Sequence, residues 1–272
     1  MAALTRHNID VPRLGFGTWC LSATTCVRSV HHALEIGYRH IDTAQMYDNE
    51  AEVGQGMVNA RVPREEIFLV TKVRPESLDS KSVQDSTEQS LRKLKTPYVD
   101  LLLIHWPSRK IPLEETLAAM FALKKSGKVR AIGVSNFPTQ LVAKAMQQGM
   151  ILTNQVEYHP YLAQQALLKQ FRAGGPFLTA YSPLARGKAC RDKTVSRIAA
   201  QHNKTPAQVV LRWLVQQEGV VAIPKAATMD HRVANFEIFD FELSDSQMQA
   251  IHGLACGRRL VNPRGGPRWD RE

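Results

Sequence analysis

The chain has 272 residues, 44% of them hydrophobic and 22% charged, a composition typical of globular proteins with a substantial core. No run of about 18 apolar residues occurs and the first residues lack an apolar signal stretch, so we expect neither a membrane protein nor a secreted one. The formal charge of +10 is dispersed without a basic cluster, so we expect no nucleic-acid partner. The four scattered cysteines indicate reduced thiols in the cytoplasm. They are Cys20, Cys26, Cys190 and Cys256.

Eight short apolar segments recur along the chain. Several, such as VDLLLI, are continuously apolar, which is typical of parallel strands buried on both faces. We predict strands at Leu14–Thr18, His40–Thr43, Ile67–Lys72, Val99–His105, Ala131–Asn136, Thr153–Tyr158, Phe177–Ser182 and Val220–Lys225.

Helices are predicted between these strands. An apolar stripe with helical spacing stops at Gly37, and another ends at Gly127. Thr205 before Pro206 predicts the capped start of a helix. Ser244, three residues before a glutamine, predicts a capping box for a late helix.

The alternation of strands and helices fits either a closed parallel barrel or a doubly wound sheet. A doubly wound dinucleotide fold carries G-x-G-x-x-G after its first strand, whereas the segment Gly15–Trp19 has only two glycines, in GFGTW. We therefore predict an α/β fold, a (β/α)8 TIM barrel that forms one domain over residues 1–272. The Gly-, Pro- and Arg-rich tail from Gly257 onward is predicted to be irregular.

Three predicted strands end in an ionisable residue: Asp42, Lys72 and His105. Any one of them could be an ordinary charge meeting solvent. The active sites of such barrels, however, lie at the carboxyl ends of the strands, where all three would gather. Tyr47, which alone could be a packing aromatic, follows Asp42 in the next loop.

The four residues fit carbonyl reduction. Hydride transfer to a carbonyl leaves an alkoxide that needs a proton, and Tyr47 is the candidate general acid. A lysine at about 4 Å would lower its pKa by about 3 units, and Asp42 would keep Lys72 charged in the pocket. His105, as imidazole or imidazolium, would orient the carbonyl. The chemistry needs no metal, and the histidines lack ligand spacing.

At these residues the sequence resembles the aldo-keto reductase family. The motifs run in order over nearly the whole chain, and the short loop after Trp106 together with the VNPRGGPRWD ending is similar to the bacterial 2,5-diketo-D-gluconate reductase branch. The motifs are GFGTW, HIDTAQMYDNE, LLLIHWP, IGVSNF, NQVEYHP, YSPLARGK and IPK.

The resemblance implies a β-hairpin that caps the amino-terminal end of the barrel, and it implies the catalytic tetrad Asp42, Tyr47, Lys72 and His105. It also implies NADPH as the cofactor, with the carboxamide at the ends of two strands, a tyrosine stacked on the nicotinamide and the adenosine near the IPK motif. The implied cofactor residues are Gly17, Thr18, Asp42, Ser135, Asn136, Gln155, Tyr181, Ser182, Pro183, Leu184, Ile223, Lys225, His231, Arg232 and Asn235.

The stretch after IPK departs from the family pattern. His231 stands where relatives carry an arginine that pairs with the 2′-phosphate, and a neutral imidazole lacks the bidentate fork. Lys225 remains, and Arg232 is a candidate to compensate. We expect NADPH binding with a weakened preference, and activity with NADH.

The predicted function is NAD(P)H-dependent reduction of aldehydes and ketones, among them keto-sugars or dicarbonyls, by a cytoplasmic monomer. Substrate would contact Tyr47, His105 and the tryptophans Trp19, Trp106 and Trp269, although each tryptophan could instead pack at the barrel rim. The alternative is a non-catalytic nicotinamide-binding redox sensor or structural barrel. A metal-dependent hydrolase on the same barrel is disfavoured, because clustered ligands are missing from the sequence.

Overall fold

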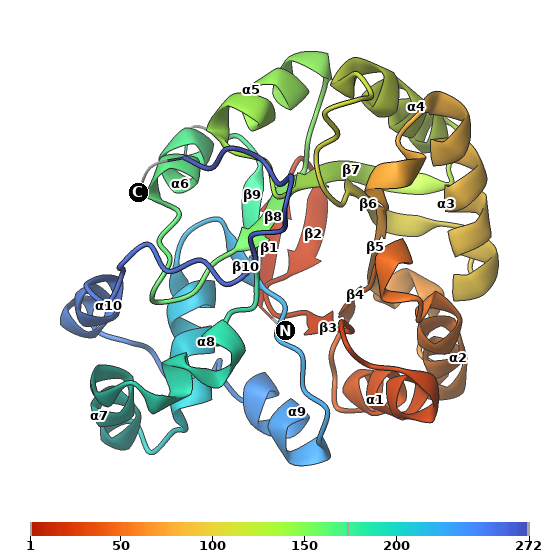
Figure 1. The fold of residues 1–272 in the computed structure, drawn as a ribbon. Coiled ribbons are helices and arrows are strands. Elements are labelled where there is room, and N and C mark those ends of the chain that lie inside the picture. Colours follow the sequence, from red (N-terminus) through yellow and green to blue (C-terminus); the bar gives the residue numbers. More distant parts are fainter. Residues whose placement is uncertain (1, 173, 271–272) are drawn as a thin grey trace.

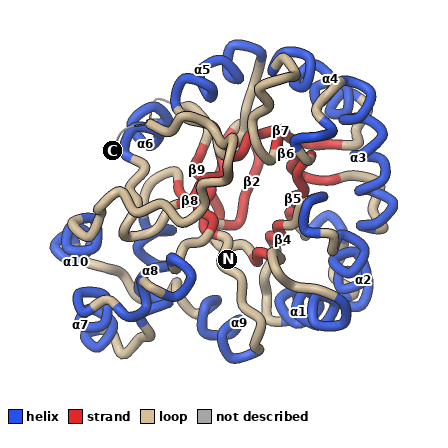
Figure 2. Tube along the Cα trace, viewed as in Figure 1, coloured by secondary structure: helices blue, strands red, loops and turns tan. Residues whose placement is uncertain are grey.

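The computed structural model describes residues 2–172 and 174–270. Eight parallel strands follow one another around a barrel in chain order, and each predicted strand is confirmed (Figures 1 and 2). They are β3 (Phe16–Gly17), β4 (His40–Asp42), β5 (Phe68–Val73), β6 (Val99–Ile104), β7 (Val129–Ser135), β8 (Thr153–Glu157), β9 (Phe177–Tyr181) and β10 (Val220–Ala222).

Helices surround the barrel, as Figure 1 shows. The predicted capping devices are present: Thr205 caps α8 with Pro206 in its first turn, and Ser244 and Gln247 form the capping box of α10. The helices are α1 (Ala23–Glu35), α2 (Glu50–Ala60), α3 (Ser80–Leu94), α4 (Leu113–Lys125), α5 (Thr139–Gln148), α6 (Gln165–Phe171), α7 (Lys193–Gln201), α8 (Pro206–Gln216), α9 (Met229–Phe236) and α10 (Asp245–His252). In the described residues none of these helices is long and apolar enough to cross a membrane.

The barrel interior is filled by side chains from the strands and from an amino-terminal hairpin. The hairpin strands β1 (Ala3–Arg6) and β2 (Ile9–Pro12) are antiparallel, and Leu4 and Val11 join the cluster that includes Phe68 inside the barrel. A larger apolar cluster lies between the strands and the surrounding helices. Because the hairpin closes the amino-terminal end, the free opening lies at the carboxyl ends of the strands.

The barrel closes between its first and last strands. Leu14 pairs with Ala222 in a parallel bridge, and the Gly15 amide donates to the Ala222 carbonyl at 2.8 Å. A Cβ on Gly15 would stand 2.8 Å from both the His40 ring and the Ile223 side chain. The first glycine of GFGTW therefore serves close packing at the seam.

The tail after α10 has no regular secondary structure, as predicted. It runs from α10 past β8 (Figure 1). Its last described residue, Asp270, accepts hydrogen bonds from the amide and the hydroxyl of Thr139, the first residue of α5, at 3.0 Å and 2.7 Å.

Replacing Gly15 with alanine should lower the free energy of unfolding by about 1–3 kcal/mol, because the added methyl overpacks the seam. Gly253→Ala is the control, since Gly253 has φ −65° and a Cβ there would meet nothing closer than 3.5 Å. Urea unfolding followed by circular dichroism measures both variants. Equal stability of the Gly15 variant and the parent chain would contradict the proposed role of the seam.

Candidate active site

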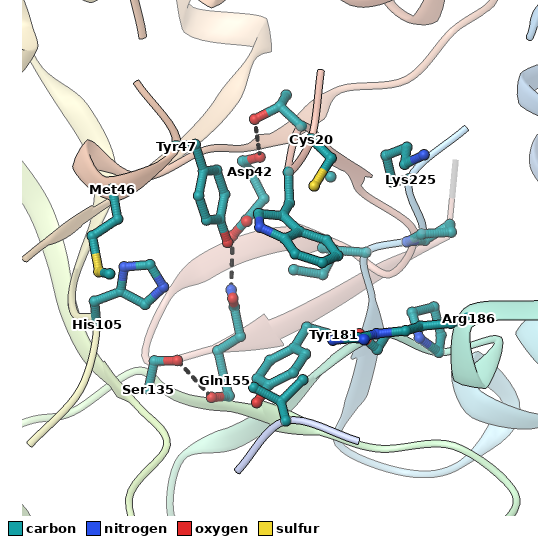
Figure 3. Close-up of a pocket in the computed structure, with 18 of the residues that line it drawn as sticks. Cys20, Asp42, Met46, Tyr47, His105, Ser135, Gln155, Tyr181, Arg186 and Lys225 are labelled. Atoms are coloured by element: carbon teal, nitrogen blue, oxygen red, sulfur yellow. Dashed lines mark hydrogen bonds between the residues drawn. The ribbon is translucent and has the colours of Figure 1, made fainter. Parts of the chain in front are cut away.

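A cavity of about 620 Å³ opens at the carboxyl ends of the strands (Figure 3). Three of the four predicted catalytic residues, Asp42, Tyr47 and His105, line it, and Lys72 lies behind them, fully buried. Residues far apart in sequence are therefore brought together as predicted. Most of the predicted cofactor residues also line it: Gly17, Thr18, Asp42, Ser135, Asn136, Gln155, Tyr181, Ser182, Pro183, Leu184, Ile223 and Lys225.

A buried ion pair lies at the base of the cavity. The Lys72 Nζ donates to Asp42 Oδ1 at 2.5 Å and to the Thr43 carbonyl at 2.7 Å, and it lies 3.3 Å from the Tyr47 hydroxyl. The second oxygen of Asp42 accepts from Gln155 Nε2 at 2.7 Å. Gln155 donates to Asp42 (Figure 3) and Tyr47 lies against Lys72, so both side chains contact the same lysine–aspartate pair.

The expectation that Lys72 lowers the pKa of Tyr47 is wrong for this structure. Burial, and next the Asp42 carboxylate, raise the pKa of Tyr47 well above its ordinary value of 10. Burial also lowers the pKa of Lys72, although Asp42 opposes that shift. The Asp42 charge offsets the field of the lysine at the phenol, so Tyr47 holds its proton firmly at neutral pH.

The surroundings of His105 favour the neutral imidazole, one of the two forms that the sequence left open. Burial, and next the charge of Lys72, lower its pKa to about 3. Its ring packs edge-on against Tyr47 with the centroids 5.6 Å apart, and its backbone carbonyl accepts from the Asn136 side chain at 3.0 Å. A neutral ring has one N–H to donate and adds no second cation beside Lys72.

Tyr47 sits on a short 3-10 turn, Gln45–Tyr47, that is fastened to the end of β5. The buried Gln45 side chain accepts from the Arg74 amide at 3.0 Å, and the Arg74 guanidinium donates to the Gln45 carbonyl at 2.7 Å. Arg74 lies two residues beyond Lys72 in the chain. The phenol and the lysine are therefore held in a common frame.

The side chains at the ends of β7, β8 and β9 form a connected polar wall. Ser135 donates to the Gln155 carbonyl at 2.8 Å, and the Tyr181 hydroxyl donates to Asn136 Oδ1 at 2.8 Å. Asn136 has φ +63°, a left-handed conformation that is strained for most residues. A wall of amide and hydroxyl groups beside a tyrosine face suits a flat carboxamide-bearing ring.

The loop after β9 repeats the left-handed conformation. Ser182, Ala185, Arg186 and Gly187 have φ of +49°, +50°, +54° and +84°. Backbone strain of this kind concentrates at ligand sites. The loop also lines the cavity, through Ser182, Arg186 and Gly187 among others.

The adenosine end matches the expectation less well. Lys225 lines the cavity and is exposed, whereas His231, Arg232 and Asn235 lie outside it. The buried guanidinium of Arg232 is engaged with the Ser29 hydroxyl at 3.0 Å and the Ala227 carbonyl at 2.9 Å. In this conformation Arg232 is turned into the protein and does not replace the missing arginine. His231 remains exposed on α9.

The three tryptophans take different places. Trp19 and Trp106 line the cavity, and Trp19 is 47% exposed at its mouth. Trp269 does not line it but packs edge-on against Trp106 with the centroids 6.2 Å apart.

Several cavity residues were not singled out from the sequence. Most lie inside the motifs that carried the resemblance, next to residues that were named, so position in a motif could have indicated them. Val261 is the first residue of the VNPRGGPRWD ending that also carried the resemblance, although the irregular tail gave no local sign that it would reach the cavity. They are Cys20, Met46, Arg186, Gly187 and Val261. Within residues 2–172 and 174–270, no three His, Cys, Asp or Glu side chains are grouped to hold a metal ion.

Comparison with known proteins agrees with this geometry. Residues 13–255 match the model of the aldo/keto reductase family, and the chain belongs to that family. The predicted family and barrel fold are therefore confirmed. The chain is a carbonyl-reducing oxidoreductase that uses a nicotinamide cofactor.

Three similar proteins show which carbonyl reductases the chain resembles. The chain is 42% identical over 268 residues to "Methylglyoxal reductase DkgB" of Salmonella typhimurium, covering 96% of this chain and 100% of that protein. It is 40% identical to "Glyoxal reductase" of Bacillus subtilis, covering 93% of each. A crystal structure of "a putative 2,5-diketo-D-gluconic acid reductase B" superposes with a TM-score of 0.98 at 44% identity, covering 100% of this chain and 98% of that one.

The protonation states predict the pH dependence of carbonyl reduction. Tyr47 must be protonated to act as an acid, so its activity is lost only as pH rises through its raised pKa. With a pKa of about 3, His105 stays neutral throughout the neutral range. We expect kcat/KM for reduction to be flat between about pH 5 and about pH 9. Initial rates at each pH measure this, with circular dichroism as the control for folding. An inflection near pH 7 would contradict the protonation states.

Proposed function

We propose that the chain uses NADPH to reduce small dicarbonyls and keto-sugars, with Tyr47 as the proton donor. The observation that carries the proposal is the contact of 3.3 Å between the Tyr47 hydroxyl and Lys72 at the base of an open cavity. We further propose that one chain, folded as a single domain, works as a monomer in the cytoplasm. The cavity supports the monomer, because one chain supplies both its acid and its walls.

In the proposed reaction the four tetrad residues have different roles. Bound NADPH supplies a hydride to the carbonyl carbon. As that C–H bond forms, the C=O π pair moves onto oxygen, which takes the phenolic proton of Tyr47 and completes the alcohol. Lys72 stabilises the phenolate left on Tyr47, and Asp42 holds Lys72 in place. The neutral His105 donates a hydrogen bond that orients the carbonyl oxygen.

The cofactor is proposed to lie along the wall from β7 to β10. Ser135, Asn136 and Gln155 would hold the carboxamide, and Tyr181 would stack on the nicotinamide. The left-handed loop that begins at Ser182 would take the pyrophosphate. The side chains are mutually hydrogen-bonded before the cofactor arrives, so little ordering is needed on binding.

The proposed substrate class rests on the cavity mouth and on the relatives. Trp19 and Met46 are 47% and 45% exposed, so the mouth presents apolar surface to an incoming substrate. Relatives named methylglyoxal, glyoxal and diketogluconate reductases point to two adjacent or nearby carbonyls.

Tyr47→Phe should lower kcat for methylglyoxal reduction at least about a hundredfold, because the phenolic proton is gone while the ring remains. The Kd for NADPH should change less than about twofold. Absorbance at about 340 nm follows turnover, and tryptophan fluorescence follows binding. Tyr161→Phe is the control, since that hydroxyl donates to Asp192 outside the cavity. Full activity of the Tyr47 variant would overturn the assignment.

His231→Arg should raise the preference for NADPH over NADH about tenfold, because a guanidinium adds a charged hydrogen bond to the 2′-phosphate. The parent chain should therefore turn over NADH measurably. The measurement is kcat/KM with each coenzyme. Lys225→Ala is the companion variant: strict NADPH selectivity that disappears on this change alone would show that position 231 does not set the preference.

A further inference from the structure

A second buried carboxylate lies at the carboxyl end of the barrel, outside the catalytic tetrad. Glu157 is the last residue of β8 and is 0% exposed. It does not line the cavity, although Gln155 on the same strand does. Burying a carboxylate costs free energy because its charge loses hydration, so several hydrogen-bond donors must compensate for that loss.

Those donors come mainly from the tail. Glu157 Oε1 accepts from the Leu260 amide at 2.7 Å, and Oε2 accepts from the Val261 amide at 2.8 Å. The His159 ring lies 2.9 Å from Oε1 on the other side. Burial opposes ionisation, but these hydrogen bonds outweigh it and lower the pKa of Glu157. One ionised side chain thus accepts hydrogen bonds from two consecutive amides of a segment that has no secondary structure of its own.

The segment that Glu157 binds, Leu260–Val261, forms part of the cavity wall. The Val261 side chain lines the cavity directly. Farther along, Trp269 packs against Trp106, and the Arg259 guanidinium stacks over Trp269 at 3.8 Å. Trp269 also donates to Asn262 at 3.0 Å. The cavity wall at Val261 therefore depends on where the tail lies, and the Glu157 carboxylate holds the tail at that residue.

We propose that Glu157 is a positioning residue that sets carbonyl-substrate affinity by anchoring the tail segment Leu260–Val261. It touches neither the carbonyl nor the cofactor, so its effect falls on KM and not on hydride or proton transfer. The KM part of this inference rests on the proposed function, whereas the anchoring part is a statement about the fold alone.

The test is Glu157→Gln, which keeps the shape but offers a single acceptor oxygen to two amide donors. Losing one hydrogen bond to a charged group should raise KM for methylglyoxal about tenfold. The kcat and the Kd for NADPH should stay within about twofold. Trypsin should cut the tail faster, at Arg258, Arg259, Arg264 or Arg268, because the segment leaves the barrel more often.

Asp100→Asn is the matched control. Asp100 is also a buried carboxylate that accepts from a backbone amide, that of Leu69 at 3.0 Å, but it lies near the start of β6, at the opposite end of the barrel. This variant should lose stability without changing KM or tail cleavage. An equal rise of KM in both variants would mean that Glu157 acts through general stability, and that result would overturn the proposal.

A second variant separates the anchor from the rest of the Glu157 side chain. Val261→Pro removes the amide that donates to Oε2 and keeps a similar side-chain volume. If the two residues act through one bond, the double variant should be no worse than the more affected single variant. Fully additive effects on KM, or tail cleavage unchanged in Glu157→Gln, would overturn the anchor. Absence of turnover by the parent chain would instead refute the proposed function, and the trypsin result would still report on the anchor.

Discussion

A lysine and an aspartate share a fully buried place at the carboxyl end of the barrel, and the site is built around that pair. Lys72 and Asp42 come from neighbouring strands, and neither charge is tolerated there without the other, since removing one partner of a buried pair costs about 3–5 kcal/mol. The pair orients Gln155 on one side and lies against the Tyr47 hydroxyl on the other. Its geometry thereby fixes where the Tyr47 hydroxyl and the Gln155 amide lie in the cavity.

The near-cancellation of charge in the pair also decides the chemistry. A lone ammonium beside Tyr47 would favour the phenolate, whereas burial and, next, the Asp42 charge raise the pKa of Tyr47 and leave the phenol protonated. A protonated tyrosine and a neutral His105 are suited to giving a proton to a carbonyl oxygen.

The rigid barrel and the irregular segments around it contribute different parts of the site. Strand ends carry Asp42, Lys72, His105 and the polar wall, where small displacements are costly. The loop after β9 and the tail complete the cavity, and both need specific anchors because they lack ladders of backbone hydrogen bonds. Glu157 is such an anchor, and Arg74 does the same for the turn that bears Tyr47.

The sequence alone determined the barrel, because continuous apolar strands, capped helices and the absence of a dinucleotide fingerprint are local patterns. It also placed Asp42, Lys72 and His105 together, since each ends a parallel strand and parallel strands end at one face. The tertiary structure decided what depends on several neighbours at once. The protonation of Tyr47 follows from its burial and from the Asp42 charge. The Arg232 guanidinium donates its hydrogen bonds inside the protein. Val261 reaches the cavity from a tail whose sequence has no periodicity. Such outcomes arise from long-range packing, which no local pattern encodes.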